Sequence, residues 1–460
     1  MEQMNFLNNV LVFIGFISLA VVTINWKRDG RILGFFFNLV ASLAFFGMLF
    51  QADQFQLSEL VVIEGNKVLL LKITAFLNIL MMLLNGHENH EKVKSSIIIN
   101  FMFLGSVFLL GATELITFYV ALETIALLGY ALVSLSNLEF SKEAAVKYLI
   151  QGAVISTIFL LGVAFYLGGT GSLDLTAPQV INHQLYAIAV GIFIMVTFFK
   201  LGAFPFHAWM ADVYSNVTSG NLATNFFVSK IIVGFKFFII LQVLIPACEP
   251  QFQNVLIKVI QLVAVVSAFY GNIIAVVQKQ WKRIIAYSSL AHTGYMLMAV
   301  ALNPDEAFEK QLISFLVLYS LTATGVILIL NQFAQIHKGR DYQSILISGF
   351  YKNKVLSVLL IIFVLSLAGI PLTSGFALKY MLFTNFFKEG FTIEAVAILV
   401  SSIIGLSYYI KFVADLFVES EEKMSLPVIR PSYGEQVVHL IAVVAIITIG
   451  IVPALFFQVN

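Results

Sequence analysis

The chain is poor in charge and in cysteine. Only 11% of its 460 residues are charged, whereas a soluble globular domain carries about 25%. The single cysteine, Cys248, excludes iron–sulfur clusters and disulfides within the chain, because both need several thiolates. The net charge of +1 gives no sign of a nucleic-acid partner.

Motifs for nucleotides and catalytic metals are missing as well. The sequence has no G-x-G-x-x-G after a strand, no P-loop and no H-E-x-x-H. We therefore expect no cofactor and no metal in this chain, and we assign any redox chemistry to partners. The first apolar stretch, residues 5–25, lacks a basic segment and a small-residue cleavage site, which predicts a retained helix and not a signal peptide.

The chain is rich in long apolar segments. Sixty per cent of its residues are hydrophobic and its mean hydropathy is +0.95. A spanning helix needs about 20 apolar residues, so the sequence predicts an all-α polytopic membrane protein with a single domain over 1–460. About fourteen transmembrane helices are expected, at 5–25, 31–51, 67–85, 94–111, 112–136, 143–168, 184–206, 218–245, 252–277, 283–302, 309–335, 354–386, 392–418 and 435–457. Within the polar loop Gln51–Asn66, polar and apolar residues alternate over Gln56–Val61, which predicts a short hairpin.

The loops carry an orientation signal. Most basic residues outside the spans follow odd-numbered helices, and the loop after helix seven has none. The positive-inside rule then places these loops in the cytoplasm and both termini on the outer, periplasmic side. The residues are Lys27, Arg28, Arg31, Lys92, Lys94, Lys142, Lys147, Lys279, Lys282, Arg283, Lys338, Arg340, Lys352, Lys354, Lys423 and Arg430.

Two predicted spans, helices seven and twelve, contain a proline: Pro205 in Lys200–His207 and Pro371 in Ser366–Gly375. Proline removes a backbone donor and breaks the helix, and in hydrocarbon the freed carbonyls need partners. Paired breaks indicate two inverted repeats with an ion path at the break. These repeats of five helices would cover 94–245 (helices four to eight) and 252–418 (helices nine to thirteen), after a segment of three helices at 1–93 and before the last helix at 435–457. The alternative is a pair of kinks that serve packing alone.

Ionisable residues inside the predicted spans are the candidate functional groups. Glu123 lies mid-helix and Lys200 just before the first proline. A charge at the bilayer centre costs roughly 2.5–3.5 kcal/mol, so the two are expected to pair. If Glu123 moved, Lys200 would switch between holding and releasing a proton. The alternative is a static ion pair that fixes the packing of the helices.

Further lysines and histidines extend this set. A buried lysine such as Lys230 or Lys379 is a natural proton carrier, and His292 and His207 add groups that titrate near neutral pH. A lone histidine is equally a hydrogen-bonded helix residue. The remaining intramembrane lysines are interpreted as structural or snorkelling, namely Lys72, Lys236 and Lys411.

With these residues in place, the chain resembles the antiporter-like membrane subunits of respiratory complex I, the proton-pumping NADH:quinone oxidoreductase. The absence of a long extension after the last helix and the presence of Lys379 favour the N type over the L and M types. The resemblance covers nearly the whole chain, in Ala121–Glu123, Lys147–Tyr148, Phe199–Leu201, Pro205–Trp209, Asp212–Tyr214, Trp281–His292 and Leu365–Pro371.

The resemblance implies roles for the candidate residues. Glu123 and Lys200 would be a coupled pair, Lys230 and His292 the central relay, and Lys379 the terminal site of proton transfer. It also implies the bacterial inner membrane, partner subunits M, L, K and J, and FMN, iron–sulfur clusters and quinone in partner chains. Two alternatives remain open at this point: a subunit of a multi-subunit cation/proton antiporter or membrane-bound hydrogenase, and a scaffold without a proton path.

Overall fold

The computed structural model describes residues 39–40, 42–43, 46–47, 55–58, 60–85, 90–136, 138–302, 306–337, 345–347, 349–418 and 433–452. The predicted helix 5–25, most of the predicted helix 31–51, and the basic residues of the loops near 27–31, 338–340 and 423–430 lie outside these ranges. Within them, eight helices are long and apolar enough to cross a membrane, and two shorter apolar helices accompany them. The polytopic all-α fold is confirmed, while the total of about fourteen spans and the inverted repeats stay predictions.

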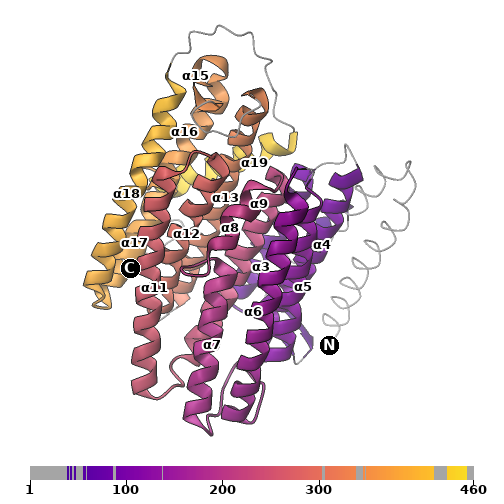
Figure 1. Ribbon diagram of the computed structural model, residues 1–460, viewed down its shortest axis with the longest axis vertical. Coiled ribbons are helices and arrows are strands. Elements are labelled where there is room, and N and C mark those ends of the chain that lie inside the picture. Colours follow the sequence, from indigo (N-terminus) through magenta and orange to yellow (C-terminus); the bar gives the residue numbers. More distant parts are fainter. Residues whose placement is uncertain are drawn as a thin grey trace. The chain divides into compact units, whose positions relative to one another are not determined.

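Long apolar runs became helices close to where their composition placed them. The helices are α3 (Asn66–Asn85), α4 (His90–Gly111), α5 (Leu115–Ser134), α6 (Ser141–Thr170), α7 (His183–Leu201), α8 (Ala208–Ser215), α9 (Ser219–Phe227), the π-helical η1 (Val228–Val233), α10 (Gly234–Leu244), α11 (Pro250–Val277), α12 (Trp281–Val300), α13 (Glu306–His337), α15 (Gly349–Lys352), α16 (Lys354–Ala368), α17 (Ser374–Lys388), α18 (Thr392–Leu416) and α19 (Tyr433–Ile451). Figure 1 shows them as a set of long helices joined by short connections.

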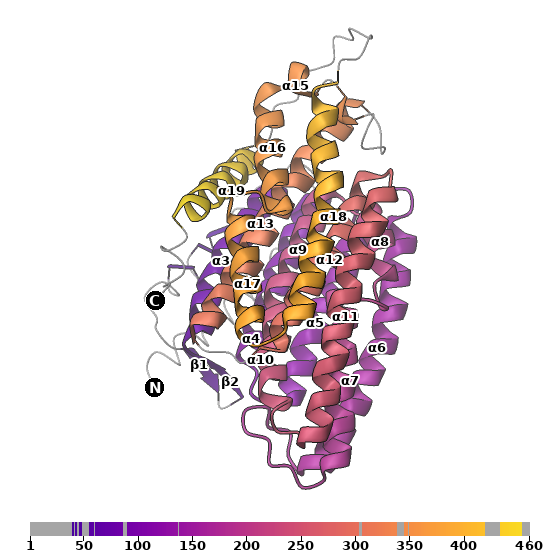
Figure 2. The same cartoon turned by 90° about the vertical axis from the view of Figure 1, so that its left-hand side faces the viewer.

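The chain divides into two compact units. The first comprises Met1–Thr197 and Asn216–Gln253, and in it α4 packs against α3, α5 and η1, while α5 packs against α6. The predicted hairpin is confirmed in this unit: β1 (Phe55–Ser58) pairs antiparallel with β2 (Val61–Ile63), with Phe55 opposite Ile63 (Figure 2).

The second unit comprises Phe198–Ser215 and Asn254–Asn460. Its central helix is α13, which packs against α16, α17 and α19, while α8 packs against α12 and α16 against α18. In the most apolar stretch of α13, 89% of the residues are buried inside the protein, whereas in the corresponding stretch of α18 only 33% are buried. We therefore read α13 as the core of this unit and α18 as one of its outward-facing helices.

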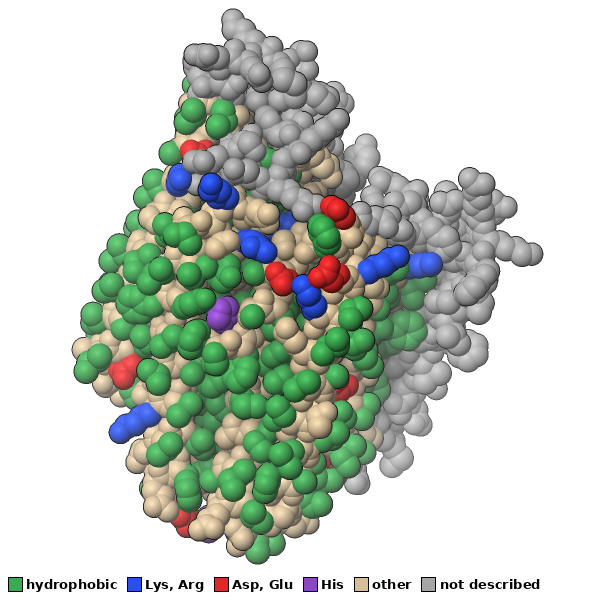
Figure 3. Space-filling model, viewed as in Figure 1, with side chains coloured by type: hydrophobic (Ala, Val, Ile, Leu, Met, Phe, Trp, Pro, Cys, Tyr) green, Lys and Arg blue, Asp and Glu red, His purple; other side chains and the backbone are tan. Residues whose placement is uncertain are grey.

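Outward-facing helices carry large apolar side chains, as contact with lipid requires. Ile150 on α6 is 59% exposed and Ile403 on α18 is 61% exposed. Figure 3 shows hydrophobic side chains over much of the face in view, with few charged ones between them. This surface explains why so little charge suffices for a chain of this length.

Candidate functional site

The first helix break lies between α7 and α8, and it is closed by a glycine turn. Gly202 has a φ of 67°, which favours glycine. Its N–H donates to the Phe199 carbonyl at 2.9 Å, and the N–H of Ala203 donates to the Phe198 carbonyl at 2.6 Å. This is the Schellman pattern of a helix C-terminus.

Neutral side chains donate to further carbonyls at this break. The indole Nε1 of Trp209 donates to the Phe199 carbonyl at 3.3 Å. The Thr293 hydroxyl shares its one proton between the Leu201 carbonyl at 3.1 Å and the Ser289 carbonyl of its own helix at 2.9 Å. Thr293 lies on α12, so a neighbouring helix serves the break. His207 packs edge-on against Tyr270, with ring centroids 4.8 Å apart, and it lines neither of the two cavities described below.

The second break, between α16 and α17, repeats the backbone turn but places a lysine at it. Gly369 has a φ of 82°, and its N–H donates to the Ser366 carbonyl at 3.0 Å while that of Ile370 donates to the Leu365 carbonyl at 3.0 Å. The next residues lead to the exposed Pro371 and to the start of α17. Figure 2 shows α16 and α17 following one another beside α18.

Lys379 on α17 turns back toward the end of α16. It is 8% exposed, and its Nζ donates to the carbonyls of Leu367 at 3.0 Å and Ala368 at 3.1 Å, and to the hydroxyl of Ser402 at 3.1 Å. A cation is favourable at a helix C-terminus because the last carbonyls carry partial negative charge. The break therefore creates the acceptors that hold a charged lysine within the apolar span.

His292 and Lys379 line the same cavity, which measures about 10 Å³. Thr322, Ser366 and Ser374 contribute hydroxyls to its wall. A single water needs on the order of 10–15 Å³ of such space, so the cavity has room for at most about one water. The structure thus brings together two of the predicted site residues, from α12 and α17, around a small cavity with hydroxyl groups in its wall.

Two tyrosines pack against the His292 ring, and one of them, Tyr319, also lines the cavity. Its ring stacks on Tyr319, with centroids 4.2 Å apart, and meets the edge of Tyr295 at 5.2 Å. The Nζ of Lys379 lies 5.5 Å from the centroid of the Tyr295 ring, within the range of a cation–π contact. Tyr295 consequently touches both groups of the candidate relay.

A buried hydrogen-bond network continues from Tyr295. The Nδ2 of Asn272 donates to the Tyr295 hydroxyl at 3.2 Å and to the Ser401 carbonyl at 2.9 Å. The Tyr408 hydroxyl donates to the Oδ1 of Asn272 at 3.1 Å. Polar groups at such depth are retained when they are satisfied and position one another, so this network holds the Tyr295 hydroxyl in place.

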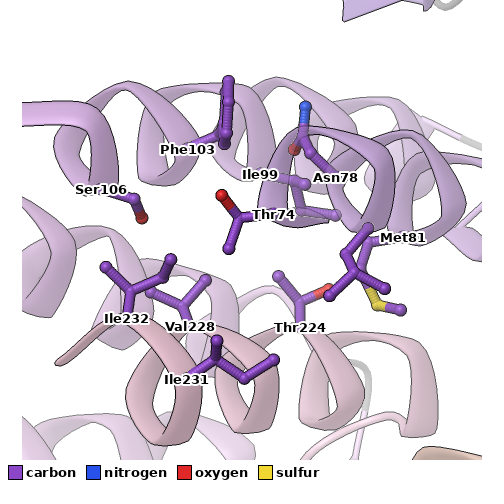
Figure 4. A pocket seen from close by; sticks show the side chains of 11 residues that line it. Thr74, Asn78, Met81, Ile99, Phe103, Ser106, Thr224, Val228, Ile231 and Ile232 are labelled. Atoms are coloured by element: carbon purple, nitrogen blue, oxygen red, sulfur yellow. The ribbon is translucent and has the colours of Figure 1, made fainter. Parts of the chain in front are cut away.

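Lys230, the third predicted lysine, lies in the π-helical turn η1 and is 1% exposed. Single π-helical turns within α-helices occur frequently at functional sites. Beside η1 is a cavity of about 30 Å³ lined by Thr74, Ser106 and Thr224 among other residues. Figure 4 shows side chains from α3 and α4 on one side of it and from η1 and α9 on the other. At 10–15 Å³ per water, the volume would admit about two waters, but most of its accessible lining is apolar.

Glu123 on α5 is half-buried and accepts a hydrogen bond from the hydroxyl of Ser156 on α6, at 2.5 Å. Lys200 occupies the last turn of α7 and is also half-buried. Glu123 belongs to the first unit and Lys200 to the second. Their pairing, and their relation to Lys230 and His292, remain predictions.

Lys236 has a structural position. It is 4% exposed, and its Nζ donates to the carbonyls of Ala112 at 2.6 Å and Leu110 at 3.2 Å, at the end of α4. It is therefore not a snorkelling residue, because its ammonium is buried and holds a helix terminus. Lys72 is half-buried and Lys411 is exposed, which agrees with their interpretation as peripheral residues.

The lone cysteine is also buried. Cys248 follows α10 and its Sγ donates to the Leu244 carbonyl at 3.7 Å. Burial raises the pKa of the Cys248 thiol to about 11, so the group stays a thiol near neutral pH. Among the described residues, no three His, Cys, Asp or Glu side chains gather closely enough to hold a metal ion.

Several residues of the site were not predicted from the sequence, notably Tyr295, Tyr319, Asn272 and Ser402. A signal existed, because polar residues recur at helical spacing within apolar spans, as in Ser288, His292 and Tyr295 on α12. What could not be read from the sequence is which of them meet across helices.

Comparison with known proteins gives the family. The model described as NADH:quinone oxidoreductase/Mrp antiporter, transmembrane, matches residues 112–405. NADH-quinone oxidoreductase subunit N 1 of Thermodesulfovibrio yellowstonii is 30% identical over 429 residues, which cover 92% of this chain and 89% of that protein.

Solved structures show the same fold. A chain of respiratory complex I from Thermus thermophilus with bound aureothin has a TM-score of 0.76 at 24% identity, covering 97% of this chain and 98% of that one. A chain of the Mrp complex from Dietzia sp. DQ12-45-1b has a TM-score of 0.78 at 18% identity, covering 98% and 94%. The chain thus belongs to the NADH:quinone oxidoreductase/Mrp antiporter transmembrane family, where its relatives include proteins named subunit N of NADH-quinone oxidoreductase.

Proposed function

We propose that the chain is a proton-translocating membrane-arm subunit of NADH:quinone oxidoreductase. The observation that carries this proposal is the cavity with room for about one water that His292 and Lys379 share beside the break between α16 and α17. A histidine and a lysine separated by one water can exchange a proton along a hydrogen-bonded path. Family membership supplies the context in which such a step performs work.

In this proposal the chain itself does no redox chemistry. FMN, iron–sulfur clusters and quinone belong to partner chains, and the neighbours in the membrane are the antiporter-like subunits M and L and the small subunits K and J. The location is the bacterial inner membrane, with both termini on the periplasmic side. The buried lysines support this role, because an ionisable group at membrane depth is costly and is retained where it has a use.

The proposed order of transfer follows the ionisable groups. Quinone reduction elsewhere changes the electrostatic field along the membrane arm and alters the pairing of Glu123 with Lys200. The proton then passes by way of Lys230 and His292 to Lys379. At the last step, the water in the shared cavity would take a proton from the His292 ring as it gives one to the Lys379 amine, which leaves histidine neutral and lysine charged.

Lys379→Met in the assembled complex tests the proposal. The substitution keeps an unbranched apolar side chain but removes the proton carrier, so protons pumped per NADH oxidised are expected to fall about 100-fold in this path. Acidification of inverted vesicles, measured together with NADH oxidation, gives that ratio. Lys388→Met, at the exposed end of the same helix, is the matched control. Unchanged pumping per NADH in the Lys379 variant would overturn the proposed path.

A second candidate is a subunit of a cation/proton antiporter, which the structural likeness to a chain of the Mrp complex favours. The two differ in what drives the protons. Vesicles that contain the assembled complex would show sodium-driven proton exchange without NADH if the antiporter reading were correct. Co-purification with flavin and iron–sulfur proteins supports the oxidoreductase reading.

A further inference from the structure

Ser402 is a polar residue at the edge of an apolar face. It lies on α18 between Leu399 and Ile403, which are 39% and 61% exposed, and it is itself half-buried. Its hydroxyl accepts a hydrogen bond from the Nζ of Lys379 at 3.1 Å. A serine could form a bond with its own helix, but the described contacts of the Ser402 hydroxyl are to Lys379 on α17 and to Tyr295 on α12.

Together with two backbone carbonyls, Ser402 gives the lysine three acceptors. The carbonyls of Leu367 and Ala368 lie 3.0 and 3.1 Å from the same Nζ. An ammonium group has three N–H donors and no acceptor, so it can satisfy all three at once. We call these three acceptors the ammonium seat.

A neutral amine does not fit this seat. It has two N–H donors and a lone pair, so one of the three acceptors would face the lone pair without a proton between them. Two oxygens of the seat are carbonyls at a helix C-terminus, where partial negative charge repels a lone pair. Loss of the proton therefore weakens the attachment of Lys379 to the seat.

In the alternative position of the side chain, the amine faces the shared cavity. Lys379 lines the same space of about 10 Å³ as His292, and Gly369 leaves room for its side chain, since a Cβ there would lie 2.9 Å from the Cδ of Lys379. The flexible four-carbon stem of lysine allows the amine to turn between neighbouring positions. There the lone pair would face the one water for which the cavity has room.

We propose that Ser402 is a positioning residue that completes the seat for the charged form of Lys379, and that the Lys379 amine alternates between this seat and a position that faces the cavity beside His292. The neutral amine turns to the cavity and takes a proton from water as His292 gives one to that water. An N–H bond forms on Lys379, an N–H bond of His292 breaks, and the water is restored. The charged amine then returns to the seat, away from the donor.

This inference rests on the proposed function and deepens it, because it gives the proton transfer at Lys379 a direction. Without the seat, the charged amine could return its proton to His292 through the same water. With it, protonation itself moves the charge toward α18. The hydroxyl of Ser402, and not its size, carries this effect.

Three variants of α18 test the proposal in the assembled complex. Ser402→Ala removes the third acceptor, and the loss of a hydrogen bond to a charged group is expected to lower pumping per NADH about tenfold. Ser402→Thr keeps the hydroxyl and is expected to restore pumping to near the wild-type ratio. Ser407→Ala is the matched control, because Ser407 is exposed on the same helix and donates to its own Ile404 carbonyl.

The outcomes separate this inference from the proposed function. A fall in Ser402→Ala with recovery in Ser402→Thr and no change in Ser407→Ala supports the seat. Normal pumping in Ser402→Ala, with pumping lost in Lys379→Met, overturns the seat and leaves the proposed function standing. An equal fall in the Ala and Thr variants, or a fall in the Ser407 control, also overturns it, because packing and not the hydroxyl would then be responsible. Normal pumping in both Ser402→Ala and Lys379→Met overturns the inference and the proposed function together.

Discussion

The two helix breaks of the second unit end their helices alike and differ in what serves the freed carbonyls. Gly202 and Gly369 both adopt a positive φ in the same pattern of backbone hydrogen bonds. At the first break the side-chain donors are the neutral Trp209 and Thr293, whereas at the second the donor is the ammonium of Lys379. Since neutral donors suffice at one break, the need to satisfy helix-end carbonyls does not by itself explain a lysine at the other.

The largest expected effect comes from the backbone of the second break. A Cβ at Gly375 would lie 1.7 Å from the carbonyl oxygen of Ser366, so Gly375→Ala must push α17 away from α16. Because backbone cannot yield as a flexible side chain does, the cost is about 3 kcal/mol or more. We expect little assembled complex in membranes and early thermal inactivation in detergent.

A glycine with space around it serves as the control for that change. At Gly168 on α6 the nearest atom to an added Cβ is the end of the Leu185 side chain, at 3.2 Å. Alanine is also the better helix former by about 1 kcal/mol, so Gly168→Ala is expected to leave stability unchanged or slightly higher. Wild-type stability in Gly375→Ala would show that the second break is not closely packed.

Much of this fold follows from apolar length alone, and the breaks follow from Gly and Pro. Glycine before a proline, in Gly202–Pro205 and Gly369–Pro371, is the signature of a helix C-terminus, and the structure ends α7 and α16 at these points. The hairpin before α3 likewise forms between residues that are close together in the sequence. Such features depend on neighbours in the sequence, which is why they can be predicted.

Features that depend on distant segments could not be predicted in this way. The partners of Lys236 are carbonyls of α4, more than 100 residues earlier. The π-helical turn at Lys230 lies in the uniformly apolar stretch Val228–Val233, where no side-chain spacing distinguishes a π-turn from an α-turn. The seat of Lys379 likewise combines α16, α17 and α18, so its composition is a result of packing and not of a motif.

The second prediction separates Lys236, which holds the carbonyls at the end of α4, from Lys379, for which proton transfer is proposed. Lys236→Met leaves the buried carbonyls at the end of α4 without their donor, at a cost of about 1–3 kcal/mol. The amount of assembled complex and its thermal stability should fall. Pumping per NADH in the complex that assembles should stay normal, in contrast to Lys379→Met.

The exposed Lys258 on α11 provides the control, and Lys258→Met should change neither quantity. If pumping per NADH fell in Lys236→Met as it does in Lys379→Met, the distinction between the two lysines would be lost. Lys236 would then belong to the proton path. Both ratios come from the same vesicle assay, so the comparison does not depend on how much complex assembles.

The smallest expected effect is at the first break. Thr293→Val and Trp209→Phe keep the shape of each side chain and remove the donor to the Leu201 or Phe199 carbonyl. Each lost hydrogen bond between neutral groups costs about 1 kcal/mol. The Trp209 and Phe199 ring centroids lie 5.8 Å apart, and a phenylalanine at position 209 keeps a ring in this contact. We expect a small loss of thermal stability in each variant and unchanged pumping per NADH. In the double variant the two losses should be roughly additive, because the two donors serve different carbonyls. A strong loss of pumping in the double variant, at normal assembly, would mean that the first break also takes part in transfer, and that the neutral donors do more than hold a helix end.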